Sequence, residues 1–163
     1  MRYLAILILA AGCATTQSIP SRIDWPIVAY PLSEQILERA DVTLAFEDLL
    51  RKSSYGRLGE ERAGFLVLDG DHFRLVLWPP THKYHAEEWR GKIPEGTVAA
   101  VHTHPIGHPE ASNVDRAESQ RVGIPMFVIT LRSVVLVTDD GRTRHFDRDD
   151  RTGVSTLHIL ARR

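Results

Sequence analysis

The chain has 163 residues, a length that fits one domain with short extensions. Hydrophobic residues make up 43% of the chain and charged residues 25%, which is the balance of a globular protein with one apolar core. The formal net charge of −1 argues against non-specific nucleic-acid binding, because proteins of that class carry a strong basic excess. Cys13 is the single cysteine, so an intramolecular disulfide is excluded.

The N-terminus has the layout of a secretory signal peptide. Arg2 supplies a positive charge, a short apolar run covers residues 4–11, and Cys13 follows small residues. The run is too short to span a bilayer, which needs about 20 apolar residues. The segment resembles the lipobox of bacterial lipoproteins, although Ala10 stands where leucine is usual. The resemblance implies cleavage before Cys13 and acylation of its side chain. Ordinary signal cleavage with an incidental cysteine is the alternative.

We therefore predict a signal peptide over residues 1–12, a lipidated tether over residues 13–31 and one folded domain over residues 32–163. Prolines recur through the tether, as expected for an extended linker. On this interpretation the mature protein belongs to the bacterial cell envelope. A lipid anchor on Cys13 holds it to a membrane, and the domain faces the periplasm or the exterior.

The first half of the domain predicts a helix followed by a hairpin. Apolar residues with helical spacing predict one amphipathic helix from about Ser33 to Lys52. Two apolar runs follow, from Ala63 to Leu68 and from Phe73 to Trp78, and the Asp-Gly between them predicts a β-hairpin. Polar residues over 81–96 predict a long loop, which in a compact domain is often functional.

The second half predicts a strand, a helix and further strands. Residues 97–102 are apolar almost throughout, as in a strand buried on both faces. A short helix is expected from Asn113 to Val122. Further strands are expected from Met126 to Thr130, from Val134 to Thr138 and near residues 144–146. The order of helix, hairpin, strand, helix and strands predicts a single α/β domain of mixed (α+β) type.

The chemically informative stretch is His-Thr-His-Pro at residues 102–105, followed by Ser-Asn-Val-Asp at residues 112–115. Alternate residues of a strand point to the same face, so both imidazoles project together from the strand end. Asp115 lies on the first turn of the following helix and can turn back over that end. Two histidines and one carboxylate leave the fourth tetrahedral position to water, which is the arrangement of catalytic zinc.

Each residue of this set also has an ordinary structural interpretation. The histidines can be strand-end residues that are hydrogen-bonded to backbone. Ser112 and Asp115 match a helix capping box, with Ser112 at the N-cap and Asp115 at the third helical position. The two interpretations are compatible, because a capping aspartate can also face a metal ion.

The complete pattern resembles a known signature. His-x-His-Pro, six residues and Ser-x-x-Asp are similar to the motif of the JAMM (MPN+) metalloprotease family. In prokaryotic members a glutamate often precedes x-x-Gly and apolar residues, and Glu-Arg-Ala-Gly at residues 61–64 matches that element. The resemblance covers residues 59–137. It implies a JAMM/MPN-like (cytidine-deaminase-like) fold, in which helices flank a sheet.

The resemblance also implies a role for each site residue. Zn2+ would be bound by three ligands: His102, His104 and Asp115. Glu61 would act as general base toward a zinc-activated water and then pass the proton to the leaving amine. Ser112 would hydrogen-bond the oxyanion of the tetrahedral intermediate.

Several polar residues lie near this pattern without belonging to it. Glu60 competes with Glu61 for the base role, but the Glu-x-x-Gly spacing and the alternation of a strand favour Glu61. His108 is interpreted as a surface histidine, with a position in the cleft as the alternative. The long loop adds three residues that either contact substrate or are ordinary loop residues: His82, His85 and Trp89.

These features predict a zinc metallopeptidase that hydrolyses a peptide or isopeptide bond. One alternative is a catalytically inactive MPN-fold binding module, although such relatives lose the metal ligands that are present here. The other is a different metal-dependent amidase acting on cell-wall peptides. A barrel-type hydrolase is excluded by length, since that fold needs about 250 residues. The expected partner is a cell-wall peptide or an exported polypeptide, and not nucleic acid.

Overall fold

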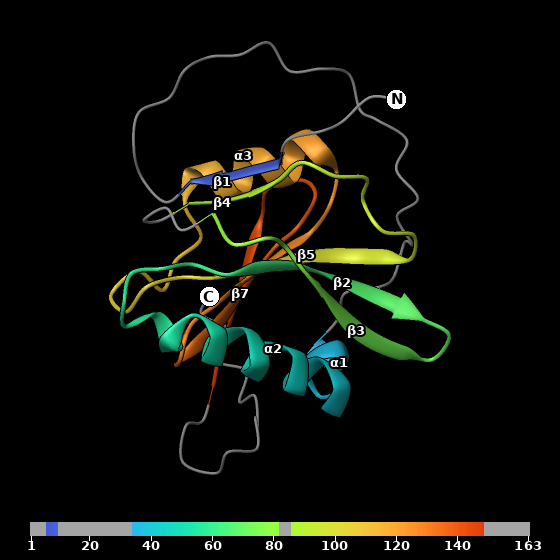
Figure 1. Cartoon of the computed structure of the whole chain (residues 1–163), viewed down its shortest axis with the longest axis horizontal. Coiled ribbons are helices and arrows are strands. Elements are labelled where there is room, and N and C mark those ends of the chain that lie inside the picture. Colours follow the sequence, from blue (N-terminus) through green and yellow to red (C-terminus); the bar gives the residue numbers. More distant parts are fainter. Residues whose placement is uncertain (1–5, 10–33, 82–85, 149–163) are drawn as a thin grey trace.

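A six-stranded mixed sheet forms the centre of the computed structural model, which describes residues 6–9, 34–81 and 86–148 (Figure 1). The strands are β2 (Ala63–Asp69), β3 (His72–Leu77), β5 (Thr97–Thr103), β6 (Met126–Ile129), β7 (Ser133–Val137) and β8 (Thr143–Asp147). They are ordered β3-β2-β5-β6-β7-β8. Only β5 and β6 are parallel among these neighbours.

Helices cover both faces of this sheet, which confirms a mixed α/β domain for the described part of the chain (Figure 1). The first face carries α1 (Glu34–Leu37) and α2 (Ala40–Lys52), and the opposite face carries α3 (Asn113–Val122). Among the described residues no helix is long and apolar enough to cross a bilayer.

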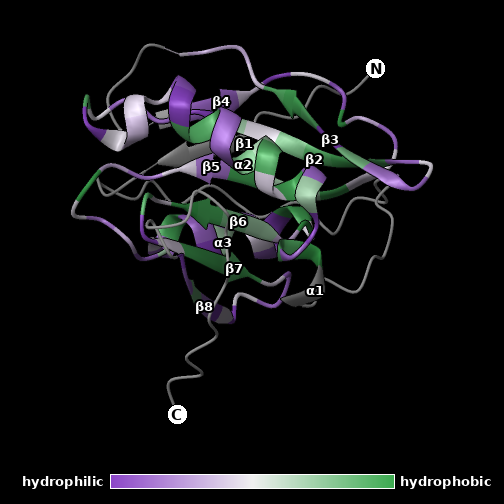
Figure 2. Cartoon of the chain, turned by 90° about the horizontal axis from the view of Figure 1, so that it is seen from below, coloured by the Kyte–Doolittle hydropathy of each residue, from purple (hydrophilic) through white to green (hydrophobic). Residues whose placement is uncertain are grey.

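An apolar core lies on each side of the sheet, because neighbouring strand residues point to opposite faces. Phe46, Leu49 and Leu50 of α2 pack with strand residues that include Phe127. The Phe46 and Phe127 ring centroids are 5.4 Å apart. On the α3 side, Phe65 packs in a second cluster with Val122 and Ile124. Figure 2 shows the hydrophobic residues concentrated along the central strands.

The burial of β5 on both faces confirms the prediction from its apolar sequence, since every residue of the strand is buried. Parallel strands require a crossover connection, and α3 supplies it between β5 and β6. The carboxyl end of β5 therefore lies near the start of α3. In open α/β sheets this is the edge at which ligands bind.

The prediction of one helix up to Lys52 was wrong, because the helical region is divided at Arg39. Arg39 has an extended backbone, with ψ 130°. Its guanidinium pairs with the Asp41 carboxylate at 2.8 Å. Asp41 also accepts hydrogen bonds from the Val42 and Phe73 N–H groups. Helical spacing along the chain cannot reveal a bond to a distant strand. Ser33, the predicted start, lies outside the described residues.

The predicted long loop over residues 81–96 contains a strand, β4 (Ala86–Trp89), which corrects that prediction. β4 pairs antiparallel with β1 (Ile6–Leu9), and β1 lies beside α3 (Figure 1). The sequence reads as a polar loop because this strand carries charged residues. One of them, Glu87, is nevertheless buried, and its carboxylate pairs with Arg62 at 3.4 Å.

Several sequence predictions fall outside the described residues. They concern Cys13, the tether that follows it and the loop residues His82 and His85. Trp89 is described, and its ring packs against Phe65 at a centroid distance of 5.3 Å. Trp89 therefore contributes to the apolar core on the α3 side.

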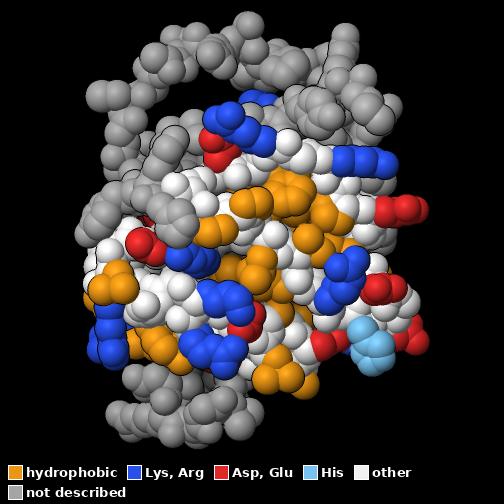
Figure 3. Space-filling view, in the orientation of Figure 1, with side chains coloured by type: hydrophobic (Ala, Val, Ile, Leu, Met, Phe, Trp, Pro, Cys, Tyr) orange, Lys and Arg blue, Asp and Glu red, His pale blue; other side chains and the backbone are white. Residues whose placement is uncertain are grey.

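Hydrophobic side chains also reach the surface. Figure 3 shows them gathered in the middle of one face, with Lys and Arg side chains around them. Among the described residues, the exposed large hydrophobic side chains are Leu44, Leu58, Leu77 and Ile106. Leu58 precedes Glu61 by three positions and Ile106 follows His104 by two, so both belong to loops that carry candidate site residues.

Candidate metal site

The two histidines extend from the carboxyl end of β5. His102 is paired with Ala63 of β2 on one side and with Val128 of β6 on the other. His104 follows the last residue of β5, and its N–H donates to the Ile129 carbonyl at 3.0 Å. This bond continues the ladder beyond the strand, so the two imidazoles project to the same side.

Asp115 is fixed by a capping box at the start of α3, as the sequence predicts. Ser112 is the N-cap, and its hydroxyl accepts a hydrogen bond from the Asp115 N–H at 3.1 Å. In return Asp115 Oδ2 accepts the Ser112 N–H at 2.6 Å. The capping bonds hold the carboxylate so that Oδ1 faces His102, while Oδ2 accepts the cap bond and also faces His104. Capping and metal binding are therefore compatible here.

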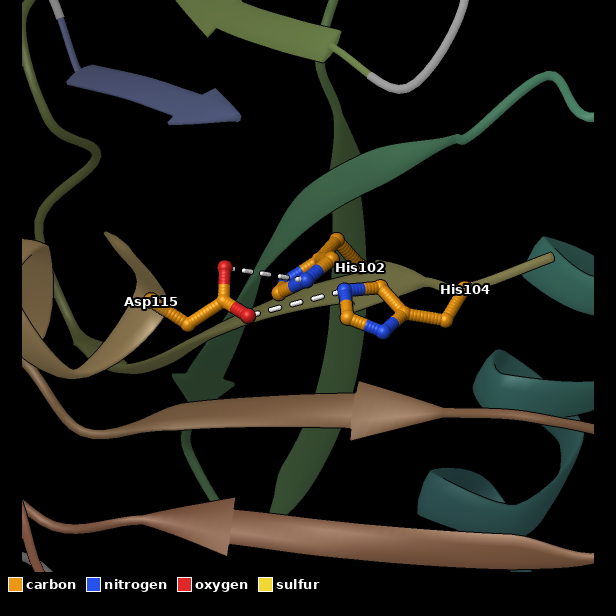
Figure 4. Close-up of side chains that lie close together, drawn as sticks. All are labelled: His102, His104 and Asp115. Carbon is orange, nitrogen blue, oxygen red and sulfur yellow. Dashed lines mark ion pairs between the residues drawn. The ribbon is translucent and has the colours of Figure 1, made fainter. Parts of the chain in front are cut away.

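The three side chains converge in the interior (Figure 4). His102 Nε2 lies 3.4 Å from Asp115 Oδ1, and His104 Nε2 lies 3.5 Å from Asp115 Oδ2. Two ligand atoms that are each about 2.1 Å from a tetrahedral ion are about 3.4 Å apart, and both histidine–carboxylate separations match that value. One ligand atom from each of the three residues lies within 4.8 Å of the others. The exposed fractions are 0% for His102, 3% for His104 and 0% for Asp115. This group can bind a metal ion.

Hydrogen bonding sets the orientation of His104. The Nδ1 atom donates to the His108 carbonyl at 2.9 Å, because a carbonyl can only accept. A neutral His104 then presents the Nε2 lone pair to the carboxylate of Asp115. Two lone pairs repel unless a cation lies between them, so the pair requires either a proton or a metal ion.

Burial and charge determine the pKa values of the three groups. Burial lowers the pKa of His102 to about 4, so this imidazole is neutral at pH 7. For His104, burial lowers the pKa, but the hydrogen bond and charge of Asp115 outweigh it and the net shift is upward. Burial raises the pKa of Asp115, but the neighbouring imidazoles and hydrogen bonds bring it down to about 2. A neutral imidazole and an ionised carboxylate are the forms that bind metal.

Glu61 lies beside this group, two residues before the start of β2. Ala63 pairs with His102 in antiparallel register, which places Glu61 opposite His104 just beyond the ladder. Only 1% of Glu61 is exposed, and burial raises the pKa of its carboxyl to about 8. Burial is the largest cause of this net shift; the charge of His104 opposes it, and the charges of Asp115 and Glu87 contribute to it. The competitor Glu60 instead pairs with Arg62 at 2.8 Å.

Two features of the site have no signal in the sequence. Arg62 donates to the Glu61 carbonyl at 2.9 Å and pairs with Glu87 of β4, so β4 supports the segment that carries Glu61. The His108 carbonyl orients His104, while the His108 side chain is exposed, as predicted. The His108 carbonyl has no signal because any residue at that position would supply the same backbone acceptor. The buried Glu87 has none because its partner, Arg62, is 25 residues away in the chain.

Comparison of the chain with protein-family models, with curated proteins and with solved structures finds no match. The functional interpretation therefore depends on the site itself: the identity of its residues, their spacing in the chain and their arrangement in the fold.

Proposed function

We propose that this chain is a zinc-dependent peptidase of the JAMM type, which hydrolyses a peptide or isopeptide bond. The observation that carries the proposal is the buried convergence of His102, His104 and Asp115 beside the buried carboxyl of Glu61. Buried titratable groups with shifted pKa values gather at functional sites more often than elsewhere. The spacing of these residues in the chain supports the JAMM assignment.

The set of donor atoms supports zinc as the metal. Two imidazole nitrogens and one carboxylate are typical of catalytic zinc sites, which keep one position open. A zinc ion held by these side chains would supply Lewis acidity and lower the pKa of a water molecule to near neutrality. Ser112 holds Asp115 in place, and the His108 carbonyl holds His104. Outer partners of metal ligands commonly have this role.

Glu61 is the residue proposed to move protons. Its carboxylate accepts a proton from the attacking water and returns the proton to the leaving amine nitrogen. A carboxyl whose pKa is raised to about 8 is suited to both steps, because a group that accepts and returns a proton works best when its pKa is near the operating pH. Arg62 and Glu87 hold the backbone that carries this carboxyl.

Ser112 is proposed to bind the carbonyl oxygen of the substrate. Its hydroxyl accepts the Asp115 N–H and can still donate its own proton. The position at the N-terminus of α3 favours developing negative charge, because the helix dipole is positive there. Ser112 therefore stabilises the oxyanion as the carbonyl carbon becomes tetrahedral.

The substrate class follows from the bond and from the proposed location outside the cytoplasm. We propose a cell-wall peptide or another exported polypeptide. The exposed side chains of Leu58 and Ile106, in the two loops that carry site residues, provide apolar contacts for such a chain. A binding module without catalysis is the second candidate, and it would bind the same peptides without cleaving them.

A cleavage screen tests the proposal. The purified protein is incubated with cell-wall peptide fragments and with unfolded protein substrates, and the products are identified by mass spectrometry. We expect cleavage that disappears after chelation and returns on addition of zinc. Binding of intact peptide by zinc-loaded protein, without cleavage of any substrate, would favour the binding module. Cleavage that survives complete metal removal would contradict the proposed mechanism.

A further inference from the structure

The turn that follows α2 has an unusual backbone. Ser54, Tyr55 and Gly56 all have positive φ, at 53°, 56° and 72°. L-residues rarely adopt these values, because Cβ approaches the backbone too closely. Such conformations persist only where the surrounding structure holds them, and they cluster at functional sites. We call these three residues the left-handed turn.

The left-handed turn packs on the segment that carries His104. The Gly56 carbonyl accepts a hydrogen bond from the Ile106 N–H at 3.2 Å. A Cβ atom at Gly56 would lie 2.7 Å from the His104 carbonyl oxygen and 3.1 Å from both Pro105 Cα and Ile106 N. These neighbours are backbone atoms, which cannot rotate away as a side chain can. The close approach of the two backbones therefore requires glycine.

The other side of the turn is anchored to α2 and to the core. The Gly56 N–H donates to the Ser53 carbonyl at 3.0 Å. The Ser53 hydroxyl in turn donates to the Leu50 carbonyl at 2.9 Å, in the last turn of α2. Tyr55 packs against the apolar cluster on the α2 side of the sheet. The turn is thus a fixed support, and a shift between it and the His104 segment would displace the histidine.

His104 is held at three points, and the left-handed turn is one of them. Its N–H is bound to the Ile129 carbonyl, its Nδ1 to the His108 carbonyl, and its own carbonyl lies against Gly56. His102 lies within β5 and Asp115 within α3, whereas His104 lies just beyond the end of β5, so displacement of His104 would separate the ligand atoms.

We propose that Gly56 is a positioning residue of the metal site. Because Gly56 has no side chain, the left-handed turn packs directly against the backbone of His104 and fixes its position. The inference rests on the proposed metal site and adds a residue that touches neither the metal nor the substrate. Outer partners of this kind typically change metal affinity by about 10- to 100-fold when they are mutated.

Two other glycines provide matched controls. Gly96 has φ 79°, and a Cβ there would lie 2.5 Å from the Leu68 carbonyl oxygen, at the opposite end of β5 from the histidines. Gly70 has φ 60° with no atom within 4 Å of its Cβ position. Gly96→Ala therefore reproduces the strain and the backbone clash away from the site, and Gly70→Ala reproduces the strain alone.

The experiment measures Co2+ binding to the metal-free full chain by visible absorption, with Zn2+ competition, alongside thermal unfolding. Gly56→Ala should bind Co2+ about 10- to 100-fold more weakly than wild type and show an altered cobalt spectrum. Gly96→Ala and Gly70→Ala should bind with wild-type affinity and spectrum, even where Gly96→Ala lowers the melting temperature. If Gly56→Ala does not fold, Tyr55→Gly is measured, since it loosens the turn without a clash and should also weaken binding.

Three outcomes would overturn the inference. Wild-type affinity and spectrum in Gly56→Ala, or in Tyr55→Gly where only that variant folds, would show that the turn does not position His104. An equal loss in Gly96→Ala would show that affinity follows overall stability. Failure of the wild-type chain to bind Co2+ or Zn2+ would remove the metal site itself, which is distinct from the first two results.

Discussion

The two faces of the central sheet differ in what they bury. Under α2 the sheet packs large apolar side chains, among them Phe46, Leu49 and Phe127. On the α3 side the apolar cluster is joined by buried titratable residues, among them Glu61, His102, His104 and Asp115. Burying such groups is costly unless they are paired or bind a metal. The comparison indicates that the α2 face stabilises the fold, whereas the α3 face retains a costly group for the proposed chemistry.

The largest effect is expected for the base on the α3 side. Glu61→Gln should keep its metal but lose hydrolysis by about 100-fold or more, because a general base is removed. Glu60→Gln should remain close to wild type, since Glu60 pairs with Arg62 near the surface. Initial rates on a cleavable substrate and zinc content are measured for both variants.

Two results would change this assignment. An inactive Glu60→Gln beside an active Glu61→Gln would move the base by one residue. Full activity in both variants would contradict the JAMM-type mechanism.

The α2 face should respond in the opposite way. Leu49 is fully buried there, and Leu49→Ala should lower the free energy of unfolding by about 2–5 kcal/mol through lost burial and the cavity left behind. Metal content per folded chain should stay at the wild-type value. Urea unfolding with elemental analysis checks both. Loss of metal from folded Leu49→Ala would show that the two faces are coupled more tightly than their separate clusters suggest.

Local patterns in the sequence predict the elements whose contacts are regular along the chain. The apolar run of β5 and the capping box at Ser112 and Asp115 were predicted at nearly the observed bounds, because alternation and capping depend on nearby residues. The spacing of three residues along the chain also predicted the group that the fold brings together, His102, His104 and Asp115.

Distant contacts set the features that the sequence does not reveal. The helix break at Arg39 depends on Asp41 binding the Phe73 N–H, and β4 depends on Glu87 pairing with Arg62. The orientation of His104 comes from the His108 carbonyl, which carries no side-chain signal. Each of these depends on residues that come together only in the folded chain.

The pH dependence of stability measures the free-energy cost of burying Glu61 on the α3 face. Folding raises the Glu61 pKa from 4.5 to about 8, so its contribution to stability is fully present below pH 4.5 and lost as pH rises through 8. Relative to Glu61→Gln, the metal-free wild type should lose up to about 1.4 kcal/mol per pH unit between these values.

Urea unfolding at several pH values, with chelator present, measures this difference. The lowered pKa of His102 makes stability change with pH in the opposite direction. His102 is present in both proteins, so its effect cancels when the two stability profiles are compared. Parallel stability profiles for wild type and Glu61→Gln would show that the Glu61 carboxyl is not buried in the metal-free protein.

The smallest effect on both faces is expected from processing of the N-terminus. We propose that Cys13, which lies outside the described residues, is lipidated after cleavage. Cleavage there removes β1, which pairs with β4 and lies beside α3 but is not a strand of the six-stranded sheet, so the melting temperature should fall less than in Leu49→Ala. Membrane fractionation of wild type and Cys13→Ser, with mass spectrometry of the N-terminus, checks the anchor. A soluble wild type that is cleaved elsewhere would contradict it.

Metal stoichiometry tests the central claim most directly. The purified wild type and the His102→Ala, His104→Ala double variant are analysed for zinc, with circular dichroism to confirm that both are folded. We expect about one zinc per wild-type chain, because three buried side chains converge on one position, and almost none in the variant. Equal zinc content in the two folded proteins would contradict the site.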